Sequence, residues 1–233
     1  MNDRKDTNGA TPIVYVIDDD KAVRESLRWL IESEDLPVDL SIETPVETPV
    51  ETPVETPVET PVETHASAIA FLAECDLGDL GCILADVRMP DMSGLELLGE
   101  LRRRGCAIPV IVVTGHGDVA MAVRAMKAGA FDFIEKPFDD GTLLNLVRNA
   151  VTASMQLRDM ASEETEARIR FEQLTPRERE VLDHIVRGAP NKAVAGALGI
   201  SEKTVEAHRA HIMAKMEAGS FAELVRRTIT AGL

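Results

Sequence analysis

This chain of 233 residues has no long apolar run, no apolar core among its first residues and only three cysteines. The purest apolar run, residues 108–113, has the length of a strand and falls far short of the roughly 20 residues of a membrane span. The opening MNDRKDTNGATP has no apolar core, so it does not predict a secretory signal. Cys75, Cys82 and Cys106 are odd in number and lack metal-binding spacing, which argues against a disulfide framework. We therefore expect a cytoplasmic protein, neither membrane-spanning nor disulfide-stapled.

Charge is distributed unevenly along the chain. The net charge is −15, yet from residue 172 to the end nine basic residues face eight acidic ones, so the acidic excess lies in the front part. Hydrophobic residues make 45% of the chain and charged residues 28%, which is typical of a globular protein. We expect two modules with different partners. If one of them binds nucleic acid, its positive charge must be local to one helix.

Five consecutive copies of Glu-Thr-Pro-Val occupy residues 43–62. A proline at every fourth residue excludes a helix and a central strand, so we expect an extended acidic segment without a core. An expanded repeat that loops out, over residues 39–62, is the favoured interpretation, and a proline-rich ligand for a partner is the alternative. The identical copies make the register of a neighbouring strand ambiguous, because any of the valines can pair with the sheet.

Apolar runs alternate with helical patterns in the front module. Strands are predicted at residues 13–17, 82–85, 109–113 and 131–134. Helices are predicted between them, around residues 23–31, 66–72, 95–101, 119–126 and 143–151. This alternation predicts an α/β, doubly wound fold with a parallel sheet.

Polar side chains stand where these strands end. They are Asp18, Asp19, Asp86, Thr114 and Lys136. Because right-handed crossovers bring the carboxyl ends of parallel strands to one edge, we expect these side chains in one crevice. Clustered carboxylates require a cation, and hard oxygen ligands suit Mg²⁺. A lysine and a hydroxyl suit a phosphate, and a carboxylate can act as its nucleophile. The alternative is a solvated cap cluster beside a surface lysine.

The last part of the chain predicts an all-α module of about 60 residues. Residues 151–171 are charged and weakly periodic, which indicates a helical linker. Capping boxes are predicted at Thr175–Glu178 and Ser220–Glu223. Three further helical segments are expected near residues 191–198, 202–216 and 221–229.

The front motifs VIDDD, ILADVRMPDMSGLELL, VIVVTGHGD and KAGAFDFIEKPF resemble the receiver domain of response regulators, over residues 12–150. The resemblance implies a flavodoxin-like sheet of five strands. It implies that Asp86 is the phosphoacceptor, and that Asp18, Asp19 and Asp86 hold Mg²⁺ with the Arg88 backbone carbonyl.

The same resemblance assigns the residues around the phosphoryl group. It implies that Thr114 and Lys136 contact the phosphoryl group, and that Phe133 is the switch aromatic. Simple packing on the sheet is the alternative interpretation of Phe133. Lys136-Pro137 is expected to be a cis peptide.

The motifs LTPREREVL, NKAVAGALGIS and KTVEAHRAHIMAKM resemble the GerE/LuxR-type helix-turn-helix, over residues 172–233. The implied recognition helix follows Ser201, a suitable N-cap, and directs Val205, Ile212 and Met216 inward. We expect Lys203, Thr204 and Glu206 nearest the bases. We expect phosphate contacts from Asn191, Lys192, His208 and Arg209.

Taken whole, the chain resembles the FixJ group of two-component transcription factors. That resemblance implies a sensor histidine kinase as phosphate donor, a homodimer on phosphorylation, promoter DNA and RNA polymerase as partners, and no enzymatic role. The family has no insertion where the repeat lies. One rival interpretation is therefore a phosphorylation-independent DNA-binding regulator whose receiver is impaired by the insertion. Another is a protein-interaction module whose helical domain is idle.

Overall fold

The computed structural model describes residues 11–33, 60–75, 78, 80–115 and 119–232. The chain divides into two compact units, one up to Arg158 and one from Asp159, and the division falls inside the predicted linker. No helix in these ranges is long and apolar enough to cross a membrane. Each unit has its own buried apolar cluster, so each is described by itself.

The front unit is built on a five-stranded sheet with all neighbours parallel, in the order β2-β1-β3-β4-β5. The strands are β1 (Ile13–Ile17), β2 (Val62–His65), β3 (Gly81–Asp86), β4 (Val110–Thr114) and β5 (Asp132–Glu135). The doubly wound α/β prediction is confirmed, and the strand order reverses between β1 and β3. The observed strands agree with the four predicted runs to within one residue at either end, and β2 is the additional strand.

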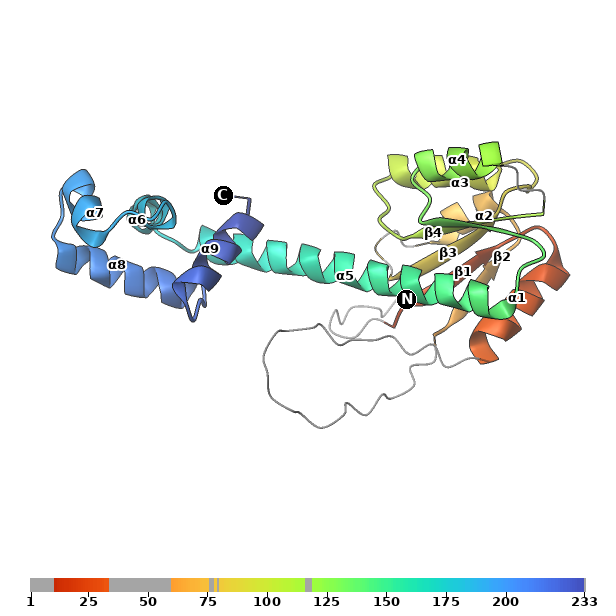
Figure 1. Ribbon diagram of the computed structural model, residues 1–233, viewed down its shortest axis with the longest axis horizontal. Coiled ribbons are helices and arrows are strands. Elements are labelled where there is room, and N and C mark those ends of the chain that lie inside the picture. The colour runs from red at the N-terminus through yellow and green to blue at the C-terminus, as the bar shows by residue number, and fades with distance from the viewer. Residues whose placement is uncertain (1–10, 34–59, 76–77, 79, 116–118, 233) are drawn as a thin grey trace. The chain divides into compact units, whose positions relative to one another are not determined.

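Helices cover both faces of the sheet (Figure 1). They are α1 (Lys21–Ser33), α2 (Ala68–Glu74), α3 (Gly94–Arg103), α4 (Val119–Lys127) and the front part of α5 (Asp140–Glu172). Successive strand residues point to opposite faces, so Tyr15 and Ile17 pack with α2 and α3, whereas Val14 and Val16 pack with α1 and α5. The predicted linker is part of the continuous helix α5.

Helix α4 differs from the expectation raised by its apolar residues. Val119, Val123 and Met126 are exposed, and Ala125 is the residue that α4 buries. Asp118 directly precedes α4 in the sequence and is of a residue type that caps helices, but it lies outside the described residues. An apolar residue in a short amphipathic helix therefore does not by itself show which face meets the sheet.

The edge strand of the sheet begins with the last residue of the repeat. Val62 begins β2, pairs with Val14 and is buried, whereas residues 39–59 of the predicted insertion lie outside the described residues. Among the five copies, this one is followed by Glu-Thr-His, where the others are followed by Glu-Thr-Pro. His65 packs its ring 5.3 Å from Phe71 and 6.2 Å from Tyr15, between centroids. A histidine at this place distinguishes one register from the others.

Strand β2 also reaches the end of β1. The Asp18 backbone N–H donates to the His65 carbonyl at 3.3 Å. The edge strand is therefore connected to the crevice through one hydrogen bond, and is not as remote from it as the sequence suggests. Because β2 begins with Val62, a deletion of residues 39–62 brings Val38 to its place.

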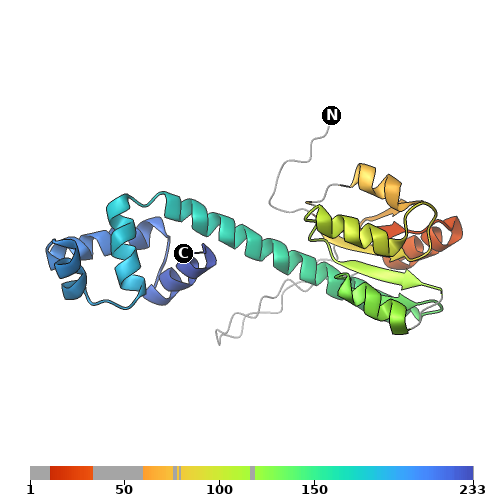
Figure 2. The same cartoon turned by 90° about the horizontal axis from the view of Figure 1, so that it is seen from above.

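The helical unit consists of α6 (Pro176–Val186), α7 (Asn191–Leu198), α8 (Glu202–Lys215) and α9 (Phe221–Thr230), together with the end of α5 (Figure 2). The capping box of Thr175 and Glu178 is confirmed. At α9 only half of the predicted box forms: Ser220 accepts from the Glu223 N–H, but the Glu223 carboxylate accepts from the Gly219 N–H at 2.8 Å.

The core of this unit follows the predicted inner face of the recognition helix. Val205, Ile212 and Met216 have no exposed surface. They pack with Val181 and Leu224, from α6 and α9. The outward residues of α8 are thereby held on a rigid, packed helix.

Gly94 is the first residue of α3 and lies against the end of β3. A Cβ built on it would stand 2.4 Å from the Asp86 carbonyl oxygen, whereas a Cβ on Gly99 of the same helix would meet nothing within 4 Å. The close approach of α3 to the last residue of β3 therefore requires glycine at position 94.

We expect Gly94→Ala to lower the free energy of unfolding by about 1–3 kcal/mol, because backbone must move to admit the methyl group. Gly99→Ala is the matched control and should raise it by about 0.5–1 kcal/mol, since alanine is the better helix residue. Urea unfolding of both variants checks this. Equal effects of the two substitutions would contradict the close approach.

Candidate functional site

The carboxyl edge of the sheet gathers residues that are distant in sequence. Asp18 directly follows β1, and Asp86 is the last residue of β3, the neighbouring strand. Thr114 ends β4, and Lys136 directly follows β5. The reversal of strand order between β1 and β3 is where open α/β sheets place their ligands. The predicted crevice thus lies at this point.

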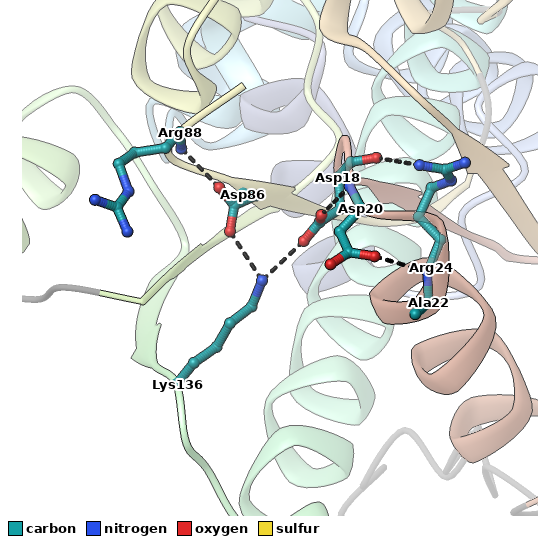
Figure 3. Close-up of polar contacts among 7 residues, drawn as sticks. All are labelled: Asp18, Asp20, Ala22, Arg24, Asp86, Arg88 and Lys136. Atoms are coloured by element: carbon teal, nitrogen blue, oxygen red, sulfur yellow. Dashed lines mark hydrogen bonds and ion pairs between the residues drawn. The ribbon is translucent and has the colours of Figure 1, made fainter. Parts of the chain in front are cut away.

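The Lys136 ammonium bridges two carboxylates (Figure 3). Its Nζ donates to Asp18 Oδ2 at 2.8 Å and to Asp86 Oδ1 at 2.9 Å. Burial alone lowers the pKa of Lys136, but the hydrogen bonds to the two aspartates outweigh it and the pKa is raised. A permanent positive charge therefore stands between the two strand ends.

Backbone N–H groups orient both carboxylates, and an arginine holds the Asp18 backbone. Asp18 Oδ1 accepts from the Asp20 N–H at 2.8 Å, and the Asp18 carbonyl accepts from the Arg24 guanidinium at 2.7 Å. Asp86 Oδ2 accepts from the Arg88 backbone N–H at 2.7 Å. The lone pairs of each carboxylate are thus aimed by neighbours. Arg24 escaped the sequence analysis, because nothing in the motif indicates that it reaches back to the end of β1.

Asp19 follows Asp18 on the loop after β1. It is exposed and lines an open hollow of about 540 Å³ with Arg88, Met121 and Arg124. Within the described ranges, no group of three His, Cys, Asp or Glu side chains is already arranged as a metal site. The hard oxygens of Asp18 and Asp86, which already share one cation, fit Mg²⁺ bound through one or two carboxylates.

Thr114 and Phe133 lie on β4 and β5, beside the site. Thr114 is 1% exposed, and its hydroxyl donates to the Met121 sulfur at 3.8 Å. Phe133 is half-buried and packs against the apolar cluster beneath α3 and α4. The Lys136 backbone N–H donates to the Thr114 carbonyl at 2.7 Å, which ties β5 to the end of β4. Lys136-Pro137 is a cis peptide, as predicted.

In the helical unit, α7 and α8 are joined by a tight turn. Gly199 ends α7 in the left-handed region, at φ 66°, and Ser201 caps α8 by accepting from the Thr204 N–H at 3.1 Å. The Thr204 hydroxyl lies 2.8 Å from the Ser201 hydroxyl. Of the predicted base-contacting residues, Lys203 and Glu206 are exposed, while Thr204 also serves the cap.

The predicted phosphate contacts lie on two helices. Asn191 and Lys192 begin α7, and His208 and Arg209 are half-buried on α8. The Arg209 guanidinium carbon lies 5.6 Å from the centre of the Phe221 ring, a cation–π contact that connects α8 to α9. Nothing in the sequence of either helix indicates this contact.

A buried ion pair fixes α8 against α6. Glu178 is 4% exposed, and its carboxylate accepts from Lys215 Nζ at 2.7 Å and from the Thr175 backbone N–H at 2.8 Å. Burial alone raises the pKa of Glu178, but the hydrogen bonds from Lys215 and Thr175 outweigh it and bring the pKa to about 2. The capping box revealed Glu178 in the sequence, whereas nothing there indicated Lys215.

Both units of the chain match known protein families. A family model for the response regulator receiver domain matches residues 54–148, and one for the luxR family of bacterial regulatory proteins matches residues 172–228. The transcriptional regulatory protein FixJ of Azorhizobium caulinodans is 46% identical over 220 residues, which are 94% of this chain and 93% of that protein. The structure of response regulator StyR is 37% identical with a TM-score of 0.75, covering 94% of this chain and 99% of that one. Full-length FixJ from B. japonicum is 35% identical with a TM-score of 0.52, covering 96% and 98%.

We expect Glu178→Gln to destabilise the helical unit by about 1–3 kcal/mol, because the Lys215 ammonium loses its charged partner. Glu180→Gln is the control; its exposed pair with Arg177 should matter by less than about 1 kcal/mol. Since the pKa of Glu178 falls from 4.5 to about 2 in the folded state, this stabilisation is fully present above pH 4.5 and is lost as the pH falls through about 2. Urea unfolding across this pH range checks both statements. A Glu178→Gln effect that does not change with pH would contradict the assignment.

Proposed function

The chain belongs to the FixJ-type two-component response regulators, in which a receiver domain precedes a luxR-type helix-turn-helix, and we propose that Asp86 is its phosphoacceptor. The protein is a phosphorylation-dependent regulator of transcription, as its FixJ relatives imply. The observation that carries the site assignment is the Lys136 ammonium held between Asp18 and Asp86. Lys136 can neutralise the negative charge of the Asp86 carboxylate and of an arriving phosphoryl group. Its ammonium lies 2.9 Å from the Asp86 carboxylate, where the transfer would occur.

The proposed reaction takes the phosphoryl group from a histidine of the cognate kinase. An oxygen of the Asp86 carboxylate attacks phosphorus, the P–N bond to the kinase imidazole breaks, and a P–O bond to Asp86 forms. Lys136 then pairs with a phosphoryl oxygen, and the Thr114 hydroxyl donates to another. The Arg88 N–H keeps its hydrogen bond to the other carboxylate oxygen and so orients the nucleophile.

Mg²⁺ is the cofactor that this donor set suits. Asp18, Asp19, Asp86 and the Arg88 backbone carbonyl would hold the ion, with water completing its shell. It would supply charge neutralisation for the transferring phosphoryl group. Carboxylates at two strand ends that already require one cation support this assignment.

Phosphorylation is proposed to act on the helical unit through dimerisation. A shift of Thr114 and Phe133 remodels the face that they adjoin, and two copies then pair. Pairing places two α8 helices on neighbouring half-sites of promoter DNA, where the protein acts with RNA polymerase in the cytoplasm. Lys203, Thr204 and Glu206 would approach the bases, and Asn191, Lys192, His208 and Arg209 the phosphates.

The repeat insertion raises the rival proposal of a regulator whose receiver no longer accepts phosphate. Two observations favour an intact receiver. Strand β2, which begins with the last residue of the fifth copy, Val62, pairs in register with β1, and the His65 carbonyl accepts from the Asp18 N–H at 3.3 Å. The proposed domains, 12–150 for the receiver, 151–171 for the linker and 172–233 for DNA binding, follow from the same interpretation.

Acetyl phosphate with Mg²⁺ should add one phosphoryl group to the full chain and shift monomer towards dimer. Asp86→Asn should abolish both effects, since the nucleophilic oxygen is lost. Asp91→Asn is the matched control on the same loop, because asparagine tolerates its positive φ of 65°. Intact mass and light scattering give the two readings. Phosphoryl uptake that persists in Asp86→Asn would overturn the assignment.

If the full chain takes up no phosphoryl group, a chain lacking residues 39–62 separates two explanations. Uptake restored by the deletion would establish the rival proposal of an impaired receiver. Uptake absent in both chains, with kinase as well as acetyl phosphate, would contradict the proposed function.

DNA binding should depend on Lys192 and Glu206 in different ways. Lys192→Ala removes a phosphate contact, so affinity should fall for every sequence and the salt slope should decrease by about 1. Glu206→Gln should relax the preference at one base position, at a cost of about 1–3 kcal/mol. Titrations of duplexes selected from a random library, at several salt concentrations, check this with exposed Lys127→Ala as control. Identical behaviour of Lys192→Ala and Lys127→Ala would contradict the phosphate contact.

A further inference from the structure

Met121 connects the site to the helix beside it. It lies in the first turn of α4, seven residues after Thr114, and its sulfur accepts the Thr114 hydroxyl proton at 3.8 Å. Thr114 is 1% exposed, so its hydroxyl is directed towards α4 inside the protein. The hydroxyl that is proposed to meet the phosphoryl group is therefore engaged with Met121 in this structure.

The Met121 side chain also meets two other features of the site. It packs against the apolar cluster that holds Ala125 and against which Phe133 packs. On its other side it lines the open hollow of about 540 Å³, together with Asp19 and Arg88. The Met121 side chain therefore adjoins Thr114, the apolar cluster against which Phe133 packs, and the hollow lined by Arg88.

A thioether is a suitable partner for a hydroxyl that must later leave. Sulfur is a weak acceptor, so the hydrogen bond holds Thr114 without competing strongly against another acceptor. A phosphoryl oxygen is charged, and a hydrogen bond to it is roughly twice as strong as a neutral one. Methionine is unbranched and repacks easily, so α4 does not have to unfold when the contact breaks.

We propose that Met121 is a positioning residue that holds the Thr114 hydroxyl in the resting arrangement and thereby sets the threshold of the switch. This inference rests on the proposed function of Asp86. Phosphorylation replaces the weak acceptor on Met121 with a stronger one, and the released methionine leaves α4 and Phe133 to rearrange. Loss of the sulfur acceptor should shift the population towards the active state, because it removes a contact made in the resting state alone.

The test compares Met121→Leu with Met126→Leu in the full chain. Leucine conserves volume but cannot accept the proton, and Met126 is an exposed methionine on the same helix. Met121→Leu should lower the acetyl phosphate concentration for half-maximal dimerisation about threefold, the size expected of one weak hydrogen bond. Met126→Leu controls for general effects of the substitution on α4.

A double-mutant cycle with Thr114→Val separates positioning from packing. In the valine background no hydroxyl remains, so Met121→Leu should then change the half-maximal concentration by less than about 1.5-fold. A threefold effect that survives in that background, or no effect in the wild-type background, would overturn the proposal. Thermal unfolding of each variant shows whether it is folded.

Methyl NMR gives a reading that needs no phosphorylation. With ¹³C-methyl methionine, the Met121 resonance of the unphosphorylated full chain should move in Thr114→Val, and it should return towards its original position in Thr114→Ser. An unmoved Met121 resonance would overturn the inference. If no chain accepts phosphate but this resonance moves as expected, the proposed function of Asp86 fails while the resting contact of Thr114 with Met121 stands.

Discussion

The bridge from Lys136 to Asp18 and Asp86 is the interaction on which the front unit depends. Two carboxylates at neighbouring strand ends repel each other, and one ammonium within 2.9 Å of both removes that repulsion. The bridge is possible because β1, β3 and β5 are parallel and end at one edge, although the lysine lies 118 residues after Asp18. The fold thus gathers the Lys136 ammonium and two carboxylates at one place. An added anion can pair with the ammonium there, and an added cation can pair with the carboxylates.

The rest of the front unit keeps that edge in position. Gly94 lets α3 approach the Asp86 carbonyl, and the Arg24 guanidinium holds the Asp18 carbonyl from α1. On the outer strand β2, His65 packs with Tyr15 and Phe71. This contact distinguishes the fifth repeat copy, which His65 follows, from the other four. The repeat can precede the edge strand because β2 needs only residues 62–65 and the contact of His65 with the Phe71 ring.

In the helical unit, apolar packing and one ion pair hold the functional helix in place. Helix α8 has an apolar inner face, and Glu178 secures it to α6 through Lys215. Because the carboxylate is also part of the capping box, one buried group both starts α6 and anchors α8. The exposed residues Lys203 and Glu206 therefore project from a helix that Ser201 caps at its start and that the Lys215–Glu178 pair holds at its end.

The sequence by itself determined the order of strands and helices, the polar residues at the strand ends, the caps at Thr175 and Ser201, and the family, because these depend on local periodicity and on motifs. Only the tertiary structure decided that Lys136 bridges Asp18 and Asp86, that the Thr114 hydroxyl meets Met121, and that Lys215 meets Glu178. It also decided that Val119 of α4 faces outward, which its apolar spacing does not reveal. The physical reason is that a side chain's partner depends on its rotamer and on elements that approach it from elsewhere in the chain, and neither is encoded in the spacing of residues along one element.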